Sequence, residues 1–149
     1  MALTTTTHLN FPGTARQALN FYRSVFDGQV QMTTYKDLGL SESAPEADKI
    51  VFGLVFAKSG FTIMAYDIPG TTQEFFGETR RENGTTITDQ PFFVSVSSDS
   101  LDELAAHWDK LAEGGKIVEP LAASEWSPGF GMITDRFGVT WTLSVAALG

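Results

Sequence analysis

The sequence predicts an α+β fold made of two consecutive βαβββ modules, because one pattern occurs twice. Residues 8–11 and 91–96 each read as a strand, and each is followed by a polar bend and an amphipathic helix, over 15–26 and 101–113. Glycines end both helices, and further strand-like segments follow. Paired modules of this kind commonly curve around a shared cavity, so the repeat also predicts where a binding site should be sought.

In the first module, the helix is the clearest element. Thr14 is a candidate N-cap. An apolar stripe at helical spacing follows it: Ala15, Ala18, Leu19, Tyr22, Val25 and Phe26. Strands are predicted over 29–35, 50–57 and 61–66, and an acidic loop over 37–48 separates the first two.

The segment after the first module has no clear periodicity. Module one is expected over about 1–68, a long connection over about 69–90 and module two over about 91–149, within a single domain. Phe75-Phe76 is unusual for a connection. These rings either pack back on the core or belong to a lid, formed by 67–90, over the cavity, and both readings stay open.

The second module repeats the order of the first. Its helix carries an apolar face: Leu101, Leu104, Ala105, Trp108 and Leu111. The N-cap is expected at Ser98 or Asp99. A short strand over 116–118, a loop over 120–129 and a last hairpin over 130–145 complete the module.

Composition excludes several classes of function. The net charge is −8 and the pI is near 4.6, and no Lys/Arg stripe is present to neutralise phosphates, so a nucleic-acid partner is not expected. Cysteine is absent, which excludes disulfides, thiolate metal sites and cysteine nucleophiles. The N-terminus lacks the features of a signal peptide and no apolar stretch is long enough to span a membrane. We therefore expect a cytoplasmic protein without a membrane partner.

Three groups of residues carry a resemblance to a known family. They are Leu9–Phe11 with Ala18–Tyr22 and Val25–Gly28; Leu111–Leu121; and Trp126 with Phe130–Val139 and Trp141. They resemble the vicinal-oxygen-chelate superfamily, with its glyoxalase/bleomycin-resistance/dioxygenase fold, and more closely its PhnB-like branch, labelled 3-demethylubiquinone-9 3-methyltransferase-like. The resemblance implies tandem βαβββ modules around a cavity, and a homodimer as the usual assembly.

The resemblance also indicates where metal ligands would stand. Metal-dependent relatives place a His or carboxylate on the first and last strands of each module. Here the corresponding positions, with that of a third-strand His common in PhnB-like relatives, hold residues that do not ligate divalent metals: Thr7, Phe92, Thr142, one of residues 62–64, and Phe52. His8 lies one residue from the expected position, and a shift of one would bring it inward as a single ligand. His107 reads as a partly exposed helix residue. We expect neither a metal nor a cofactor.

An aromatic-rich interior is the remaining candidate for a site. Most aromatic residues of a small domain are simply core, so the candidates are chosen by position. The candidate ligand-binding residues are His8, Asn10, Phe52, Tyr66, Phe92, Glu125, Trp126 and Trp141. Trp126 is favoured because it lies in a loop. Relatives tend to carry a basic residue shortly after this Trp, whereas Gly129 stands here; if that residue binds an anionic ligand in the relatives, this chain lacks it.

Three functions remain open. The leading hypothesis is a metal-free protein that binds a small apolar or aromatic molecule, and catalysis is not expected on balance. The alternative is a metal-dependent lyase or isomerase of glyoxalase or dioxygenase type. A third possibility is a small oligomeric protein without a ligand of its own. Methyltransferase activity is not supported, because no strand–Gly-x-Gly-x-x-Gly–helix unit is present.

Overall fold

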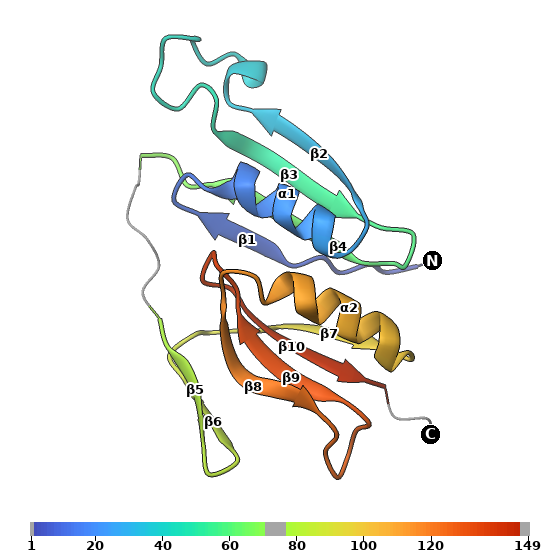
Figure 1. The fold of residues 1–149 in the computed structure, drawn as a ribbon. Helices are drawn as coiled ribbons and strands as arrows, with labels where there is room; N and C mark the ends of the chain where they lie inside the picture. The colour runs from blue at the N-terminus through green and yellow to red at the C-terminus, as the bar shows by residue number, and fades with distance from the viewer. Residues whose placement is uncertain (1, 71–76, 147–149) are drawn as a thin grey trace. The chain divides into compact units, whose positions relative to one another are not determined.

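The computed structural model describes residues 2–70 and 77–146, and the chain divides into two compact units, Met1–Phe75 and Phe76–Gly149 (Figure 1). Within the described residues each unit contains one four-stranded sheet and one α-helix, so the predicted α+β fold with repeated βαβββ modules is confirmed. The Phe75-Phe76 pair lies outside the described residues. Neither α-helix of the described part is long and apolar enough to cross a bilayer.

The first unit follows the predicted order of elements. They are β1 (His8–Phe11), α1 (Ala15–Val25), β2 (Gln29–Thr34), the 3₁₀ turn η1 (Lys36–Leu38), β3 (Ile50–Phe56) and β4 (Thr62–Asp67). The strands are ordered β1-β4-β3-β2; β1 runs parallel to β4, and the other pairs are antiparallel. Helix α1 lies across one face of this sheet, as Figure 1 shows, and leaves the other face without a helix.

Helix α1 packs closely on the sheet because β3 carries a glycine beneath it. Ala15, Ala18, Leu19 and Tyr22 are fully buried on the face of α1 that meets the sheet. A Cβ added at Gly53 would collide with the Leu19 side chain and lie 2.9 Å from the Ala65 carbonyl oxygen. The missing side chain therefore sets the distance between helix and sheet.

The second unit repeats this arrangement. Its elements are β5 (Thr79–Glu82), β6 (Thr85–Thr88), β7 (Val94–Ser98), α2 (Leu101–Leu111), β8 (Lys116–Ala122), β9 (Phe130–Thr134) and β10 (Thr140–Val145). The main sheet is ordered β7-β10-β9-β8, and β7 runs parallel to β10 as β1 does to β4. Gly131 on β9 corresponds to Gly53 on β3. A Cβ there would lie 2.5 Å from the ring of Trp108 on α2.

The β5–β6 hairpin lies within residues 69–90, the segment predicted as a long connection between the modules without clear periodicity. Asn83 and Gly84 occupy the turn with φ values of 52° and 77°. Two successive positive φ values are typical of the type I′ turn that favours Asn-Gly. The dipeptide was thus a usable hairpin signal, but its flanking strands are short and rich in Thr, without an apolar alternation.

Three boundaries in the second unit also differ from prediction. The strand predicted over 91–96 begins at Val94, after Pro91, and leaves Phe92 outside it. Strand β8 continues to Ala122 with two register shifts, because an edge strand tolerates the proline at 120. The N-cap of α2 is Ser100, whose hydroxyl accepts a hydrogen bond from the Glu103 amide at 3.2 Å.

The aromatic residue types are divided between the units. All three tyrosines, Tyr22, Tyr35 and Tyr66, belong to the first unit, and all three tryptophans, Trp108, Trp126 and Trp141, belong to the second.

Candidate functional site

The helix-free face of the first unit brings together half of the predicted site residues. Leu9 and Phe11 are buried on the α1 side of β1, so His8 and Asn10 point to the opposite side. His8 pairs in register with Met64 on the parallel strand β4, and Asn10 pairs with Tyr66. The residue of β1 on this face is therefore His8 and not Thr7, one position from the expectation based on the family resemblance.

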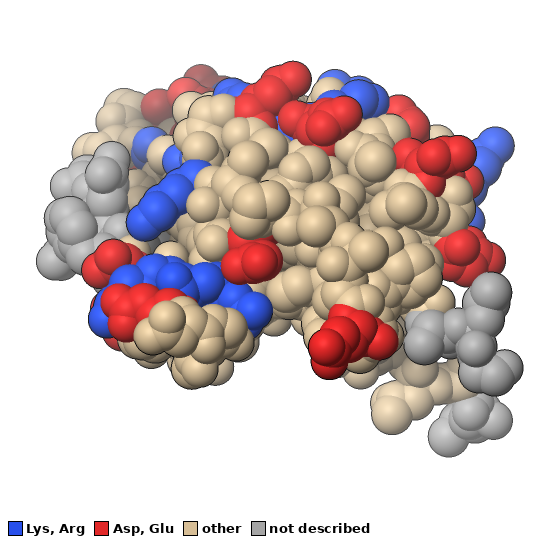
Figure 2. All heavy atoms as spheres, turned by 60° about the horizontal axis from the view of Figure 1, so that its bottom comes forward, with Lys and Arg blue, Asp and Glu red and all other residues tan. Residues whose placement is uncertain are grey.

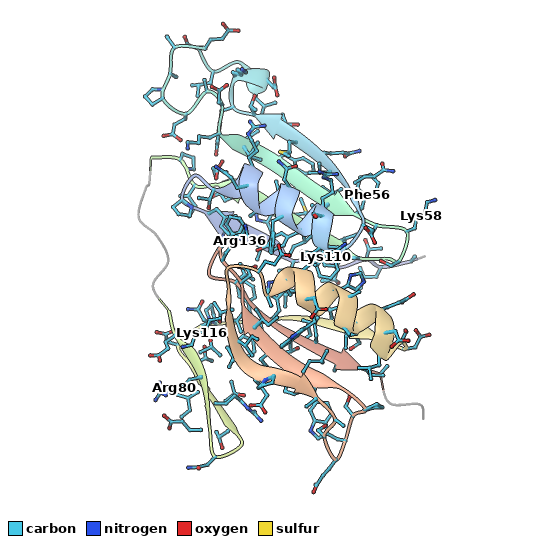
Figure 3. The ribbon with its side chains drawn as sticks, viewed as in Figure 1. Phe56, Lys58, Arg80, Lys110, Lys116 and Arg136 are labelled. Atoms are coloured by element: carbon cyan, nitrogen blue, oxygen red, sulfur yellow. The ribbon has the colours of Figure 1, made fainter. Side chains whose placement is uncertain are left out.

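Strand β3 adds apolar side chains to the same face. Gly53 faces α1, so its neighbours Phe52 and Leu54 face away from the helix. Leu54 pairs with Met64 in register, and the Phe52 side chain is 40% exposed. Phe56 continues the row at the end of β3, as labelled in Figure 3. We call the following set the first-unit face: His8, Asn10, Phe52, Leu54, Phe56, Met64 and Tyr66.

His8 is held on the first-unit face by two neighbours. Its Nδ1 atom lies 3.1 Å from the Asn10 Oδ1 atom. Its ring meets the Tyr66 ring edge to face, with centroids 5.3 Å apart and planes at 61°. Asn10 lies two residues further along β1, and Tyr66 is the register partner of Asn10 on β4, so the pairing of these two strands places both neighbours beside the imidazole.

Buried polar contacts fix the end of β4 beneath this face. The Asp67 carboxylate, which is 1% exposed, accepts hydrogen bonds from the Ala15 amide at 2.9 Å and the Ile50 amide at 2.8 Å. The Tyr35 hydroxyl donates to the Asp67 carbonyl oxygen at 2.8 Å. Burial raises the pKa of Tyr35, and the nearby groups Tyr66, Asp67 and Glu46 raise it further. These bonds hold the strand that carries Tyr66.

The corresponding face of the second unit is lined by hydroxyl groups. Ser95 and Thr142 lie 2.7 Å apart, and Ser97 and Ser144 lie 3.3 Å apart, as cross-strand pairs between β7 and β10. These residues offer each other hydrogen bonds and little apolar surface. The two helix-free faces therefore differ in chemistry although their strands correspond.

The β5–β6 hairpin packs against this second face. The Arg81 Nε atom lies 3.3 Å from Glu119 Oε2 on β8, and the Thr86 hydroxyl lies 3.7 Å from the Met132 sulfur on β9. Met132 is only 2% exposed. The hairpin thus covers part of the second face, while the described residues place no comparable hairpin on the first-unit face.

The structure does not bring the four predicted site residues of the second unit together on one face. They are Phe92, Glu125, Trp126 and Trp141. Trp141 is fully buried on the α2 side of β10, and its Nε1–H donates to Asp135 Oδ2 at 2.9 Å. Trp126 is 61% exposed, with its ring centroid 4.9 Å from that of Phe130. Glu125 is exposed beside it, and Phe92 is 52% exposed ahead of β7. Trp141 is thus a core residue, and we leave it out of the candidate site, together with Phe92, Glu125 and Trp126, which belong to the second unit and not to the first-unit face.

The side chains that the structure describes do not form a set that fits a divalent metal ion. Within the described residues, no group of three His, Cys, Asp or Glu side chains is arranged to hold one. On the first-unit face His8 stands among amide, thioether and aromatic neighbours, and on the second face Glu119 is paired with Arg81. A catalytic divalent site normally needs three protein ligands of nitrogen or carboxylate type.

Met64 and Leu54 are members of the face that the sequence analysis did not single out. Each lies two residues from a predicted site residue on the same strand and shares its face: Met64 with Tyr66 on β4, and Leu54 with Phe52 on β3. The two-residue period of a strand was therefore a sufficient signal for both.

Comparisons with known proteins show which family and which solved structures this chain resembles. The model of the glyoxalase/bleomycin resistance protein/dioxygenase superfamily matches residues 8–143. Protein PA1353 from Pseudomonas aeruginosa superposes with a TM-score of 0.75 at 28% identity, covering 97% of this chain and 98% of that one. The PhnB protein from Bacillus cereus superposes with a TM-score of 0.69 at 25% identity, covering 97% of this chain and 100% of its own.

Among curated proteins, YjdN of Escherichia coli (strain K12) is 37% identical over 54 residues. That stretch makes up 36% of this chain and 37% of YjdN, so the match spans little more than a third of the relative.

Proposed function

This chain belongs to the glyoxalase/bleomycin resistance protein/dioxygenase superfamily and is related to PhnB-like proteins, and from that premise we propose that it binds a small apolar or aromatic molecule on its first-unit face without a metal ion. The proposal concerns binding, and we assign no catalytic step and no methyl transfer to the site.

The observation that carries the proposal is the composition of the first-unit face. Three aromatic residues, Phe52, Phe56 and Tyr66, share it with Leu54 and Met64, and each of these residues is partly exposed. Contiguous apolar surface with a few polar groups is typical of ligand sites, and it is unusual on a surface without a binding role. His8 and Asn10 supply the polar groups.

The binding test uses the methionines as reporters at known positions. With carbon-13 in the methyl groups, Met64 reports on the first-unit face, whereas Met32 pairs with Gly53 on the α1 side and Met132 lies under the hairpin. Titration with a small aromatic probe such as 1-methylindole should shift the Met64 signal and leave those of Met32 and Met132 in place. Equal shifts at all three sites, or none, would overturn the proposed site.

Two exposed phenylalanines provide a matched pair of variants. Phe52→Ala removes an aromatic ring from the first-unit face, and Phe92→Ala removes a similarly exposed ring from a segment outside it. We expect Phe52→Ala to weaken probe binding about tenfold, because roughly 50 Å² of lost apolar contact is worth about 1.3 kcal/mol. Phe92→Ala should bind as the unaltered protein does.

The metal-free part of the proposal has a separate test. The purified protein is loaded with Zn²⁺, Ni²⁺, Mn²⁺ or Fe²⁺, dialysed, and examined by elemental analysis. Substoichiometric metal with every ion is the expected result. Near-stoichiometric metal that is lost in His8→Ala would instead favour the alternative, a metal-dependent lyase or isomerase of glyoxalase or dioxygenase type.

We also propose that the chain forms a homodimer. Each main sheet ends in strands that have a partner on one side within the described residues, namely β1 and β2 in the first unit and β7 and β8 in the second. Unpaired strand edges favour pairing with a further strand. Sedimentation equilibrium should give twice the 16.2 kDa mass of the chain, and a monomer mass over a wide concentration range would refute the dimer.

A further inference from the structure

Among the described residues, one ring nitrogen of His8 has a hydrogen-bond partner and the other has none. Its Nδ1 atom lies 3.1 Å from Asn10 Oδ1. A carboxamide oxygen can only accept a hydrogen bond, so Nδ1 carries the hydrogen in this pair. In a neutral imidazole with its hydrogen on Nδ1, the lone pair is on Nε2. Asn10 thereby selects the tautomer in which Nε2 is an acceptor.

The surroundings of this acceptor are aromatic and apolar. The His8 ring meets the Tyr66 ring edge to face at 5.3 Å, and His8 is paired in register with Met64. Leu54 lies beside Met64 on the next strand. A ligand that covers these groups removes water from the imidazole, and a buried acceptor without a partner is unfavourable. The bound molecule therefore needs a donor for His8.

We infer that the ligand of the first-unit face is a planar aromatic compound that carries a ring N–H or O–H group, which donates a hydrogen bond to His8 Nε2. This inference rests on the proposed function and names the class of molecule for that site. Asn10 acts as a positioning residue, because it orients His8 and fixes its tautomer without a required contact to the ligand.

The test compares indole with 1-methylindole, in which a methyl group replaces the hydrogen of the ring N–H donor, by calorimetric titration. The unaltered protein should bind indole about three- to tenfold more tightly, the range expected for one neutral hydrogen bond. In His8→Phe, which keeps a ring beside Tyr66 but removes the acceptor, the ratio of the two affinities should fall to about one. The same substitution at the other histidine, His107→Phe on α2, should leave the ratio unchanged.

A second measurement addresses the role of Asn10. Nitrogen-15 spectra of the imidazole should report hydrogen on Nδ1 in the unaltered protein and a larger share on Nε2 in Asn10→Leu, in which the preference for indole should also fall. An unaltered Nδ1–H signal in Asn10→Leu would overturn the positioning role.

The outcomes separate the two proposals. Binding of both probes with equal affinity, or a preference that persists in His8→Phe, would overturn the donor inference and leave the aromatic site standing. Failure of both probes to bind or to shift the Met64 methyl signal would overturn the proposed function and the inference that rests on it.

Discussion

At the scale of single residues, each unit is held together by a buried carboxylate that accepts several hydrogen bonds. Asp67 joins the first turn of α1 to the start of β3 through the Ala15 and Ile50 amides. Asp135 accepts from the Phe137 amide at 2.8 Å and from the Trp141 indole at 2.9 Å. Removing such a group leaves buried amide hydrogens without an acceptor, which is more costly than the loss of the bonds themselves.

Asp67→Ala should therefore lower the free energy of unfolding by about 2–4 kcal/mol, since two buried donors lose a charged acceptor. Urea titration measures the change. The control is Asp48→Ala, whose side chain is 80% exposed in a surface pair with Lys36, and this substitution should leave the free energy of unfolding nearly unchanged. Equal effects of the two substitutions would contradict this role for Asp67.

Asp37 should give part of the stability a dependence on pH. It exchanges two hydrogen bonds with Thr34: the Thr34 amide donates to Asp37 Oδ2 at 2.9 Å, and the Asp37 amide donates to the Thr34 hydroxyl at 3.3 Å. The bond from the Thr34 amide is the main cause that lowers the pKa of Asp37 below its ordinary 3.8. The folded pKa lies below the unfolded one, so the stabilisation is complete above pH 3.8 and is lost as the pH falls through the folded pKa.

The measurement is the urea midpoint of the unaltered protein and of Asp37→Asn across the acidic range. The variant should be slightly less stable near neutral pH, and the two midpoints should converge at strongly acidic pH. A gap that stays constant over the whole range would contradict the assignment.

At the scale of elements, the β5–β6 hairpin is attached to the sheet of the second unit by one of two adjacent arginines. Arg81 reaches Glu119 on β8, and both side chains are partly buried, at 25% and 38% exposure. Arg80 points to the other side, away from β8 in Figure 3, and pairs with Glu82 at 2.8 Å within its own strand. Arg80 and Arg81 therefore carry the same charge, but only Arg81 contacts the main sheet.

Arg81→Gln should loosen the hairpin and expose Met132 beneath it. Oxidation of the Met132 thioether by dilute hydrogen peroxide, followed by peptide mass spectrometry, should become several-fold faster, on the order of three- to tenfold, because access to a buried sulfur depends on local opening. Arg80→Gln should leave the rate unchanged, with Met64 as the internal reference. An unchanged Met132 rate in Arg81→Gln would show that the ion pair does not hold the hairpin.

The contact between helix and sheet in each unit depends on a glycine. Gly53 beneath Leu19 and Gly131 beneath Trp108 occupy corresponding strands, and neither leaves room for a methyl group. Gly53→Ala and Gly131→Ala should each lower the free energy of unfolding by about 1–3 kcal/mol through overpacking. Gln31→Ala, on the exposed side of β2, should change it by less than about 0.5 kcal/mol. Glycine variants as stable as the unaltered protein would show that the helices can move outward freely.

At the scale of the whole molecule, the fold could be predicted because the pattern is repeated and both helices have strong apolar stripes. The site was predictable only in part. The side of the sheet to which His8 points depends on the strand register, because a shift of one residue moves a side chain to the opposite face. The family resemblance places the inward position at Thr7, one residue before His8. From the sequence, Trp141 could equally be a core residue or a residue that lines the cavity. The hydrogen bond from its indole to Asp135, which the tight turn between β9 and β10 brings close, is visible only in the structure.

The charge of the molecule is unfavourable for binding nucleic acid. Asp and Glu number 18 and Lys and Arg number 10, and on the face seen in Figure 2 blue and red side chains are interspersed over a largely uncharged surface. A gel-shift assay with duplex DNA at moderate salt should therefore give no retarded band. Salt-sensitive retardation would reveal a local basic patch that the net charge conceals.

The separation of the tyrosines and tryptophans between the two units has a practical consequence. Trp108 and Trp141 are 7% and 0% exposed in the core of the second unit. Fluorescence excited at wavelengths that tryptophan alone absorbs therefore monitors that half of the chain, while circular dichroism monitors both halves. If the two signals change at one denaturant concentration, the halves unfold as a single cooperative system; if they change at different concentrations, each half has its own transition. The native sequence thus contains, without any attached dye, a reporter that distinguishes one half of the duplicated fold from the other.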